Sequence, residues 1–286
     1  MSTLYVVATP IGNLGDMSPR AVETLKEVGL IAAEDTRVTM KLTAHFDIHT
    51  PLVSCHQHNE RDKSQSIVER MLSEDMDVAL VTDAGTPAIS DPGTFLVRRC
   101  AEAGIPVMAV AGPSAMAAAM SVSGFDCTEF TFYGFLPRQK NELREKLKDM
   151  ARCSACAIVH ESPYRVRELT ETIAETLPEV RVSASCDLTK LHEKTIRGTA
   201  REVADALAQN EKAEKGEYCL VLDLRNVPRP AEQAAAGDVS LEARLFERLL
   251  AGEELRTARE SLMAEGYKKN AVYAAAMRVK SYLETE

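Results

Sequence analysis

Short apolar runs alternate with longer segments of helical periodicity through the first 224 residues of the chain. Such alternation is typical of α/β proteins, in which strands form a sheet covered by helices. The apolar runs, which we predict as strands, are residues 4–8, 30–33, 52–53, 78–81, 105–110, 129–135, 155–159, 180–185, 193–197 and 218–224.

The pattern changes at two places, which divide the chain into three predicted parts. The alternation restarts near residues 120–128, so we expect one α/β domain over 1–125 and a second over 126–227, each a sheet flanked by helices. A Pro-, Ala- and Gly-rich linker then leads into a helical tail, making 228–286 the third part. Predicted helices in the tail are 241–250, 257–264 and 270–283.

The stretch from Asp77 to Gly93 organises the first predicted domain. Four apolar residues, a buried parallel strand, are followed by Asp83-Ala84-Gly85-Thr86-Pro87, which has the chemistry of a tight turn. Ser90 or Asp91 can cap the next helix, with Pro92 in its first turn. In open α/β sheets ligands bind beyond the carboxyl ends of the strands, so this loop is the predicted binding site.

Two polar motifs allow more than one interpretation. Glu34-Asp35-Thr36-Arg37 follows a predicted strand and is either a helix start with acids at its amino end or a polar cluster facing a cleft. His56 and His58 share a face if the segment is extended, but no matching ligand motif follows, so we expect no metal. The pair Cys153-x-x-Cys156 also stands alone and is interpreted as ordinary thiols.

Composition narrows the possible classes of function. The net charge is −9, there is no tryptophan and aromatic residues make up 5% of the chain. This argues against broad electrostatic capture of nucleic acid, although it permits a local basic patch. Seven cysteines without framework spacing, and no apolar stretch near the ~18 residues of a membrane span or a signal peptide, predict a cytoplasmic protein with reduced thiols.

Several nucleotide-binding and hydrolase motifs are missing from the sequence. Neither the phosphate loop G-x-x-x-x-G-K-[ST], nor G-x-G-x-x-G, nor the nucleophile elbow G-x-S-x-G occurs. Instead, the loop after the first strand and the Asp83 loop carry Gly, Pro and small polar residues. These let the backbone approach a ligand closely without forming an anion nest, which suits a nucleoside that lacks a phosphate chain.

Seven motifs together resemble one protein family over nearly the whole chain. They are V-V-A-T-P-I-G-N-L-G-D from Val6, A-A-E-D-T-R from Ala32, T-D-A-G-T-P-A-I-S-D-P-G from Thr82, G-P-S-A from Gly112, G-F-L-P from Gly134, E-S-P-Y-R from Glu161 and K-K-N-A-V-Y from Lys268. In this order they resemble the ribosomal RNA-modifying branch of the tetrapyrrole (corrin/porphyrin) methylase superfamily.

The resemblance implies a two-domain homodimeric α/β fold and S-adenosylmethionine-dependent methylation. The implied acceptor is the 2′-hydroxyl of a cytidine ribose in the decoding region of 16S ribosomal RNA, within the small ribosomal subunit. The implied contacts to the methyl donor are Pro10, Asp83, Gly85, Thr86, Ile89 and Ser114 on one side, and His160, Glu161 and Leu188 on the other. The chain departs from the family pattern at Cys186-Asp187, where Arg-Glu is expected.

Methyl transfer to a hydroxyl needs positioning, a proton acceptor or a cation near the developing alkoxide, and no metal. We assign Asp35 and Arg37 to this polar rim, with Lys190 as a further catalytic candidate. Arg165 is the predicted phosphate contact, and Lys268 and Lys269 the predicted RNA contacts of the tail. Structural salt bridges are the alternative for the first four of these residues, and a solvated helical cap is the alternative for the tail.

Two other functions remain open from the sequence. A tetrapyrrole C-methyltransferase would share the fold and the donor site, and a catalytically silent donor-binding module could act in ribosome assembly. The acidic charge fits an RNA enzyme that recognises an assembled subunit through shape and a basic groove formed by the dimer.

Overall fold

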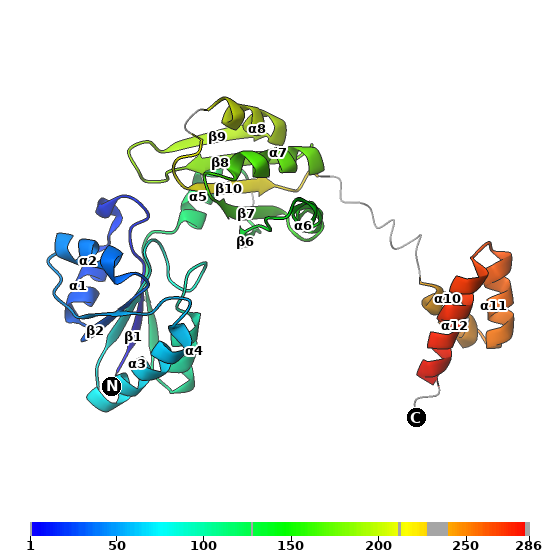
Figure 1. The fold of residues 1–286 in the computed structure, drawn as a ribbon, viewed down its shortest axis with the longest axis horizontal. Coiled ribbons are helices and arrows are strands. Elements are labelled where there is room, and N and C mark those ends of the chain that lie inside the picture. Colours follow the sequence, from blue (N-terminus) through cyan, green and yellow to red (C-terminus); the bar gives the residue numbers. More distant parts are fainter. Residues whose placement is uncertain (1, 127, 211–212, 228–239, 284–286) are drawn as a thin grey trace. The chain divides into compact units, whose positions relative to one another are not determined.

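The computed structural model describes residues 2–126, 128–210, 213–227 and 240–283. The chain divides into two units, Met1–Val227 and Pro228–Glu286. The first unit contains two five-stranded sheets among its described residues (Figure 1). The predicted fold class, α/β sheets flanked by helices with a helical C-terminal region, is confirmed.

The first sheet is entirely parallel. Its strands, in spatial order, are β3 (Leu52–Ser54), β2 (Leu30–Ala33), β4 (Val78–Val81), β1 (Leu4–Val7) and β5 (Val107–Val110). Because β2 and β4 are buried at every position, they are apolar throughout rather than alternating. The carboxyl ends of all five strands therefore meet at one edge of the sheet.

Helices cover both faces of this sheet. On one face, α3 (Glu60–Glu74) and α4 (Thr94–Glu102) enclose a core that includes Leu4, Leu80 and Met71. The opposite face packs against α1 (Pro19–Glu27) and α2 (Thr36–His45). Ser18 caps α1, because its hydroxyl accepts a hydrogen bond from Ala21 N–H.

The predicted cap of α4 is wrong. Neither Ser90 nor Asp91 caps this helix, and Pro92 precedes it; α4 begins at Thr94 with Gly93 as its N-cap at φ 131°. The buried Glu60 side chain at the start of α3 replaces the local cap, since its Oε1 accepts hydrogen bonds from Gly93 N–H (2.9 Å) and Phe95 N–H (2.7 Å). Because a carboxylate from a neighbouring helix caps α4, the loop before α4 needs no capping side chain of its own. Its residues can therefore face the carboxyl edge of the sheet.

The second sheet is mixed. Its order is β6 (Thr131–Phe135), β7 (Cys156–Glu161), β10 (Tyr218–Asp223), β8 (Arg181–Cys186) and β9 (Lys194–Thr199). β6 and β7 run parallel, and the other neighbouring pairs are antiparallel. β10, the last strand among the described residues, thus lies at the centre of the sheet.

One face of the second sheet is covered by three helices that follow its own strands. These are α6 (Lys140–Cys153), α7 (Val166–Thr176) and α8 (Ala200–Gln209), with Leu147, Ile173 and Leu207 in the shared core. α8 starts with the capping box formed by Thr199 and Glu202.

The other face is covered by α5 (Ala115–Ser123), which follows the last strand of the first sheet. Its alanine- and methionine-rich surface packs against Ile158, Cys219 and Val221 of the second sheet. Arg197 of β9 holds the carboxyl end of α5 through hydrogen bonds to the Val122 and Ser123 carbonyls. The proposed domain boundary at 125/126 therefore follows an element that belongs to the first domain in sequence but packs on the second sheet.

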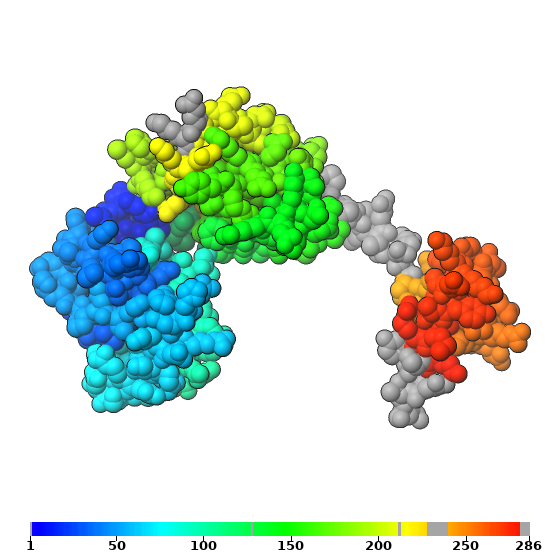
Figure 2. Space-filling model, viewed as in Figure 1, coloured from blue at the N-terminus to red at the C-terminus, as the bar shows by residue number. Residues whose placement is uncertain are grey.

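The second unit, whose described residues are orange to red in Figure 2, is a bundle of α10 (Leu241–Leu250), α11 (Leu255–Ala264) and α12 (Lys269–Leu283). It has its own apolar core. Leu245, Leu262 and Val272 are among its buried residues. The predicted linker falls largely on 228–239, which lie outside the described residues.

We predict that Glu60→Ala lowers the free energy of unfolding by about 1–3 kcal/mol, because two N–H groups at the start of α4 lose a buried acceptor. Urea denaturation measures the change. Glu60→Gln, which keeps an acceptor oxygen, should lose less. Asp62→Ala, in the same helical turn but exposed, is the control and should stay within about 0.5 kcal/mol of the parent. Equal losses in Glu60→Ala and Asp62→Ala would refute the capping role.

Candidate active site

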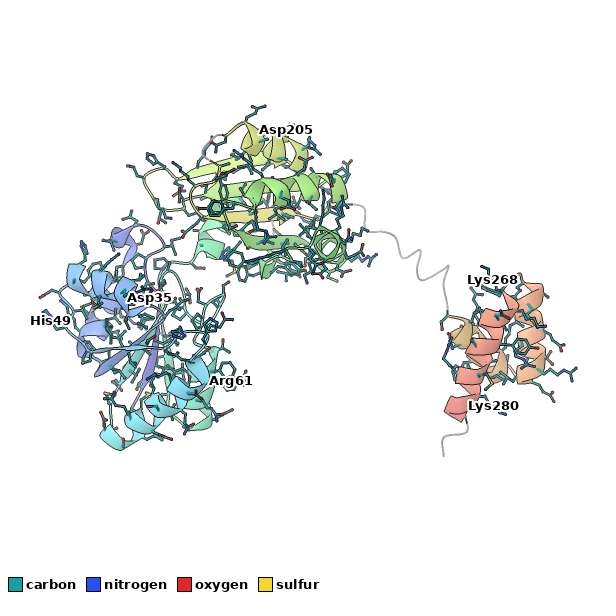
Figure 3. All side chains as sticks on the ribbon, in the orientation of Figure 1. Asp35, His49, Arg61, Asp205, Lys268 and Lys280 are labelled. Atoms are coloured by element: carbon teal, nitrogen blue, oxygen red, sulfur yellow. The ribbon has the colours of Figure 1, made fainter. Side chains whose placement is uncertain are left out.

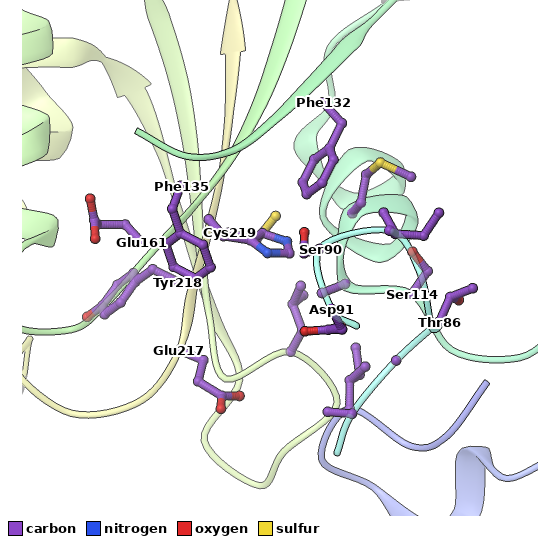
Figure 4. Close-up of a pocket in the computed structure, with 18 of the residues that line it drawn as sticks. Thr86, Ser90, Asp91, Ser114, Phe132, Phe135, Glu161, Glu217, Tyr218 and Cys219 are labelled. Carbon is purple, nitrogen blue, oxygen red and sulfur yellow. The ribbon is translucent and has the colours of Figure 1, made fainter. Parts of the chain in front are cut away.

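A cavity of about 400 Å³, hereafter the main cavity, lies where loops of the first sheet meet the second sheet (Figure 4). The size is typical of a site for a small organic ligand. Its lining comprises Ile11, Ala84, Gly85, Thr86, Ile89, Ser90, Asp91, Ser114, Ala115, Met116, Phe132, Phe135, His160, Glu161, Ser162, Pro163, Leu188, Glu217, Tyr218 and Cys219. Seven of the nine predicted donor contacts are in this set: Gly85, Thr86, Ile89, Ser114, His160, Glu161 and Leu188.

Strand pairing in the second sheet brings sequence-distant residues to one wall of the main cavity. His160 of β7 is paired with Phe135 of β6 on one side and with Cys219 of β10 on the other. The His160 ring makes edge-to-face contacts with Phe132 and Phe135, at centroid distances of 5.1 and 5.9 Å. Tyr218 is the β10 partner of Glu161.

The opposite wall comes from the first sheet. Gly85, at φ 79°, turns the loop after β4 and pairs with Thr9 through two backbone hydrogen bonds of 2.9 and 3.0 Å. Thr86 Oγ1 donates to the Pro113 carbonyl at 3.2 Å, which ties this loop to the start of α5. The first turn of α5, with the N-cap residue Ser114, thereby faces the cavity.

The charged side chains that line the main cavity are all acidic. Its lining contains three acids, Asp91, Glu161 and Glu217, and neither lysine nor arginine. Burial raises the pKa of Asp91, and the nearby Asp83 carboxylate adds to this effect. A cation or a neutral ligand suits such a cavity, whereas a polyphosphate would be repelled.

Two buried polar atoms in the cavity wall lack a hydrogen-bond partner among the described residues: His160 Nε2 and Glu161 Oε2. Burial lowers the pKa of His160, although Glu217 opposes the effect, so the imidazole is neutral at pH 7. Glu161 Oε2 still has the Arg165 guanidinium 3.5 Å away, so His160 Nε2 is the atom of the wall that a polar group could satisfy.

The two remaining predicted donor contacts, Pro10 and Asp83, line a smaller cavity of about 230 Å³. The paired Thr9 and Gly85 backbones separate it from the main cavity, because Ile11 and Gly85 line the main one while Pro10, Gly12 and Asp83 line the smaller one. The predicted donor site therefore covers both sides of this backbone pair.

The polar cluster predicted after β2 fits both sequence interpretations. Asp35 caps α2, as its carboxylate accepts from Arg37 N–H (2.8 Å), and its backbone N–H donates to Asp83 Oδ1 (3.1 Å) at the carboxyl edge of the sheet (Figure 3). The Asp35 carboxylate also binds the Arg37 guanidinium, with distances of 2.6 Å from Nη2 to Oδ2 and 3.0 Å from Nε to Oδ1. Asp83 N–H in turn donates to Glu34 Oε2 at 3.3 Å.

These neighbouring carboxylates differ in basicity. The hydrogen bond from Arg37 lowers the pKa of Asp35 to about 2. Burial raises the pKa of Glu34 and of Asp83, despite a hydrogen bond from a backbone N–H to each. Asp35 is therefore the weakest base of the three and serves better to orient Arg37 than to accept a proton.

Lys190 and Arg165 are engaged in ion pairs. Lys190 Nζ lies 2.9 Å from Glu217 and 3.1 Å from Asp187, and these hydrogen bonds raise its pKa against the opposing effect of burial. Its aliphatic stem lies over Gly12 of the first-sheet loop, where an added Cβ would be 2.5 Å from Lys190 Cγ. Arg165 Nη2 lies 3.5 Å from Glu161 and donates to the Pro137 carbonyl at 3.1 Å. Lys268 and Lys269 belong to the second unit, at the start of α12.

Several cavity residues are not indicated by sequence patterns. The local pattern suggests a helix cap for Asp91, and Phe135 stands out only as part of the G-F-L-P motif. Glu217, Tyr218 and Cys219 carry no signal, because nothing local shows that β10 enters the sheet beside β7.

Two further features concern metal binding and membranes. The described residues contain no group of three or more His, Cys, Asp or Glu side chains able to hold a metal ion. His58 N–H donates to His56 Nδ1 at 3.2 Å. No helix within the described ranges has the length and apolar character to cross a membrane.

The family model of the tetrapyrrole (corrin/porphyrin) methylases matches residues 3–204. Solved structures with the same fold include the methyltransferase CobJ (TM-score 0.56, 16% identity, covering 78% of this chain and 94% of that one). Uroporphyrin III C-methyltransferase from Thermus thermophilus is another (TM-score 0.55, 15% identity, 78% and 97% covered). The chain therefore belongs to the tetrapyrrole (corrin/porphyrin) methylase family.

Curated relatives carry a more specific name. Ribosomal RNA small subunit methyltransferase I of Pseudomonas aeruginosa is 41% identical over 283 residues, which covers 96% of this chain and 97% of the relative. The protein of that name from Neisseria meningitidis serogroup B is 39% identical, with 98% and 94% covered, and the one from Xylella fastidiosa is 44% identical, with 77% and 81% covered. The resemblance found in the motifs is confirmed.

We predict that Glu34→Gln raises the free energy of unfolding at pH 7, because burial disfavours the charged carboxylate of the parent. The gain should be at most about 1 kcal/mol, since solvent screens a half-exposed group. A carboxyl whose folded-state pKa is raised costs stability as pH rises above its ordinary value of 4.5. The gain should therefore disappear near pH 4, where the parent carboxyl is protonated. Urea denaturation at the two pH values measures it.

Glu23→Gln, an exposed substitution on α1, is the control and should show no pH-dependent difference. A Glu34→Gln variant that is less stable than the parent at pH 7 would contradict the prediction that the ionised Glu34 carboxylate destabilises the fold.

Proposed function

We propose that this chain is an S-adenosylmethionine-dependent methyltransferase that methylates the 2′-hydroxyl of a cytidine ribose in the decoding region of 16S ribosomal RNA. The observation that carries the proposal is the 41% identity with the Pseudomonas aeruginosa ribosomal RNA small subunit methyltransferase I over 96% of the chain. That match extends into the second unit, whereas the C-methyltransferase structures cover 78% of the chain. It therefore favours the ribosomal RNA reaction over tetrapyrrole C-methylation.

The main cavity fits the proposed donor. S-Adenosylmethionine carries a net positive charge and no phosphate, which matches a lining with three acids and no basic side chain. Apolar side chains such as Ile89, Met116 and Leu188 offer surface for the nucleoside, and the N–H groups at the start of α5 suit the donor's carboxylate. His160 Nε2 would gain the hydrogen-bond partner that the described residues do not give it.

When bound, the donor supplies a methyl group on a sulfonium, which passes to the ribose oxygen by in-line displacement and leaves a neutral thioether. The task of the chain is to align the acceptor with the cavity and to handle the proton of the hydroxyl. Alignment of this kind can supply several kcal/mol of the barrier reduction, roughly 7–11 in the best cases.

We assign removal of the proton from the ribose hydroxyl to the polar cluster at the carboxyl edge of the first sheet. Arg37, held by Asp35, would stabilise negative charge on the ribose oxygen. The carboxylates with raised pKa, Glu34 and Asp83, are the stronger bases beside it and are the proposed proton acceptors. Lys190 remains a further candidate and would have to leave Glu217 or Asp187 to contact the substrate.

The remaining elements of the proposal concern the substrate and the assembly. We propose that the chain acts in the cytoplasm as a homodimer on the small ribosomal subunit, with Arg165, Lys268 and Lys269 as RNA contacts. A net charge of −9 disfavours free capture of RNA and agrees with recognition of an assembled particle by shape.

Titration calorimetry with S-adenosylmethionine and S-adenosylhomocysteine tests the donor. Transfer of labelled methyl groups to small subunits from a strain lacking this modification tests the reaction. Primer extension at low nucleotide concentration should then show a new ribose-methyl stop in the decoding region. Donor binding without transfer would favour the silent module, and a stop that is absent from 16S RNA would refute the assignment.

We predict that Asp35→Asn lowers turnover roughly tenfold or more while leaving the donor Kd nearly unchanged. Asparagine keeps the helix cap but removes the charge that orients Arg37. Asp47→Asn, an exposed position beyond the other end of α2, is the matched control. Unchanged turnover in Asp35→Asn would remove the Asp35–Arg37 pair from the mechanism.

A further inference from the structure

The three most exposed large apolar side chains described in the first unit lie in the cavity lining or within three residues of it in the sequence. They are Phe135 (63% exposed), Tyr164 (80%) and Leu191 (93%). Phe135 lines the cavity, Tyr164 follows the lining residue Pro163, and Leu191 lies three residues after Leu188 of the lining. Isolated exposed apolar residues need no explanation, but a group around one cavity marks a binding surface.

The two aromatic residues are held on neighbouring turns. Phe135 ends β6 and Tyr164 lies on the turn after β7, and these strands run parallel with Phe135 opposite His160. Arg165 joins the two turns, because its guanidinium donates to the Pro137 carbonyl at 3.1 Å. Both rings are thus fixed to the carboxyl edge of one pair of strands.

Positive charge lies on the same two turns. Arg138 follows the β6 turn and is exposed, and the part of the chain that the structure describes offers it no hydrogen-bond or ion-pair partner. Arg165 lies on the β7 turn beside Tyr164. Aromatic rings next to arginine side chains are the combination that binds single-stranded RNA, with rings stacking on bases and cations contacting phosphates.

The charge of the cavity restricts which part of an RNA can enter. Its acids, Asp91, Glu161 and Glu217, oppose a phosphate but not a neutral base. An unstacked nucleobase placed on Phe135 and Tyr164 would lie at the mouth, while its phosphates stay outside near Arg138. A ribose hydroxyl is accessible to an enzyme when its nucleotide leaves the helical stack.

We infer that Phe135 and Tyr164 form a nucleobase subsite that stacks one unstacked base of single-stranded RNA at the mouth of the main cavity, with Arg138 as a phosphate contact. This inference rests on the proposed function and specifies how its RNA substrate is held. It assigns to the two rings a role in RNA binding, and Tyr164, which lies outside the cavity lining, has none in binding the methyl donor.

The test compares Phe135→Leu, Tyr164→Leu and the control Phe130→Leu, using the full chain. Phe130 is an exposed phenylalanine of the same segment, 46% exposed, and lies outside the cavity lining. Two quantities are measured for each: the KM for small ribosomal subunits in the methyl-transfer assay, and the Kd for S-adenosylhomocysteine by calorimetry. The Kd also reports whether a variant is folded.

Each of the two test variants should raise the KM roughly tenfold, the loss typical of removing one base–aromatic stack. Tyr164→Leu, which lies outside the lining, should leave the donor Kd unchanged. Phe130→Leu should change neither value. A parental KM in Tyr164→Leu would overturn the inference, and so would a weakened donor Kd with an unchanged KM in either variant, since the rings would then serve the donor. Absence of transfer by the parent protein would instead refute the proposed function itself.

Phe135→Leu could change both the KM for subunits and the donor Kd, because Phe135 lines the cavity. Tyr164 is almost fully exposed and is not part of the lining, so its variant then distinguishes a role in RNA binding from a role in donor binding. A raised KM in Tyr164→Leu alone supports the subsite, and a parental KM in that variant overturns it.

Discussion

The packing of α5 on the second sheet is the contact on which the rest of the site depends. The helix leaves the last strand of the first sheet, but its apolar surface is buried against β7, β8 and β10, and Arg197 fixes its end. This places its first turn between the β4 loop and the His160 wall. Without the α5 contact, Gly85, Ser114 and His160 would have no reason to share one cavity.

Each wall of that cavity is then fixed by a different kind of force. Backbone pairing of Thr9 with Gly85 sets the first wall, and the carboxylate of Glu60 holds the far end of the same loop. Strand register sets the second wall, since a slip of one residue would turn His160 and Cys219 to the opposite face. The positions of both walls are thus set mainly by hydrogen bonds of the main chain.

Much of the fold follows from local sequence signals. The strands over 30–33 and 78–81 agree with the predicted bounds because apolar runs act within a few positions, and Thr199 caps α8 through contacts that are equally local. Most predicted donor contacts also line the main cavity, since the motifs that carry the family resemblance lie on its loops. The cap of α4 failed for the opposite reason: Glu60 is 33 residues away from Gly93, and no local pattern reports that hydrogen bond.

The position of β10 shows the same limit for the site. Its apolar run predicts a strand, but its insertion between β7 and β8 depends on the competition among all pairings of the second sheet. Glu217, Tyr218 and Cys219 therefore reach the cavity through topology alone. Likewise, the raised pKa of Glu34 and the lowered pKa of Asp35 arise from burial and from the Arg37 contact, which adjacent positions in a sequence do not specify.

The three carboxylates that line the main cavity, Asp91, Glu161 and Glu217, bear on product release. The proposed donor loses the positive charge of its sulfonium when it gives up its methyl group. The carboxylates would therefore attract the incoming molecule more strongly than the outgoing thioether, which would favour exchange of product for fresh donor.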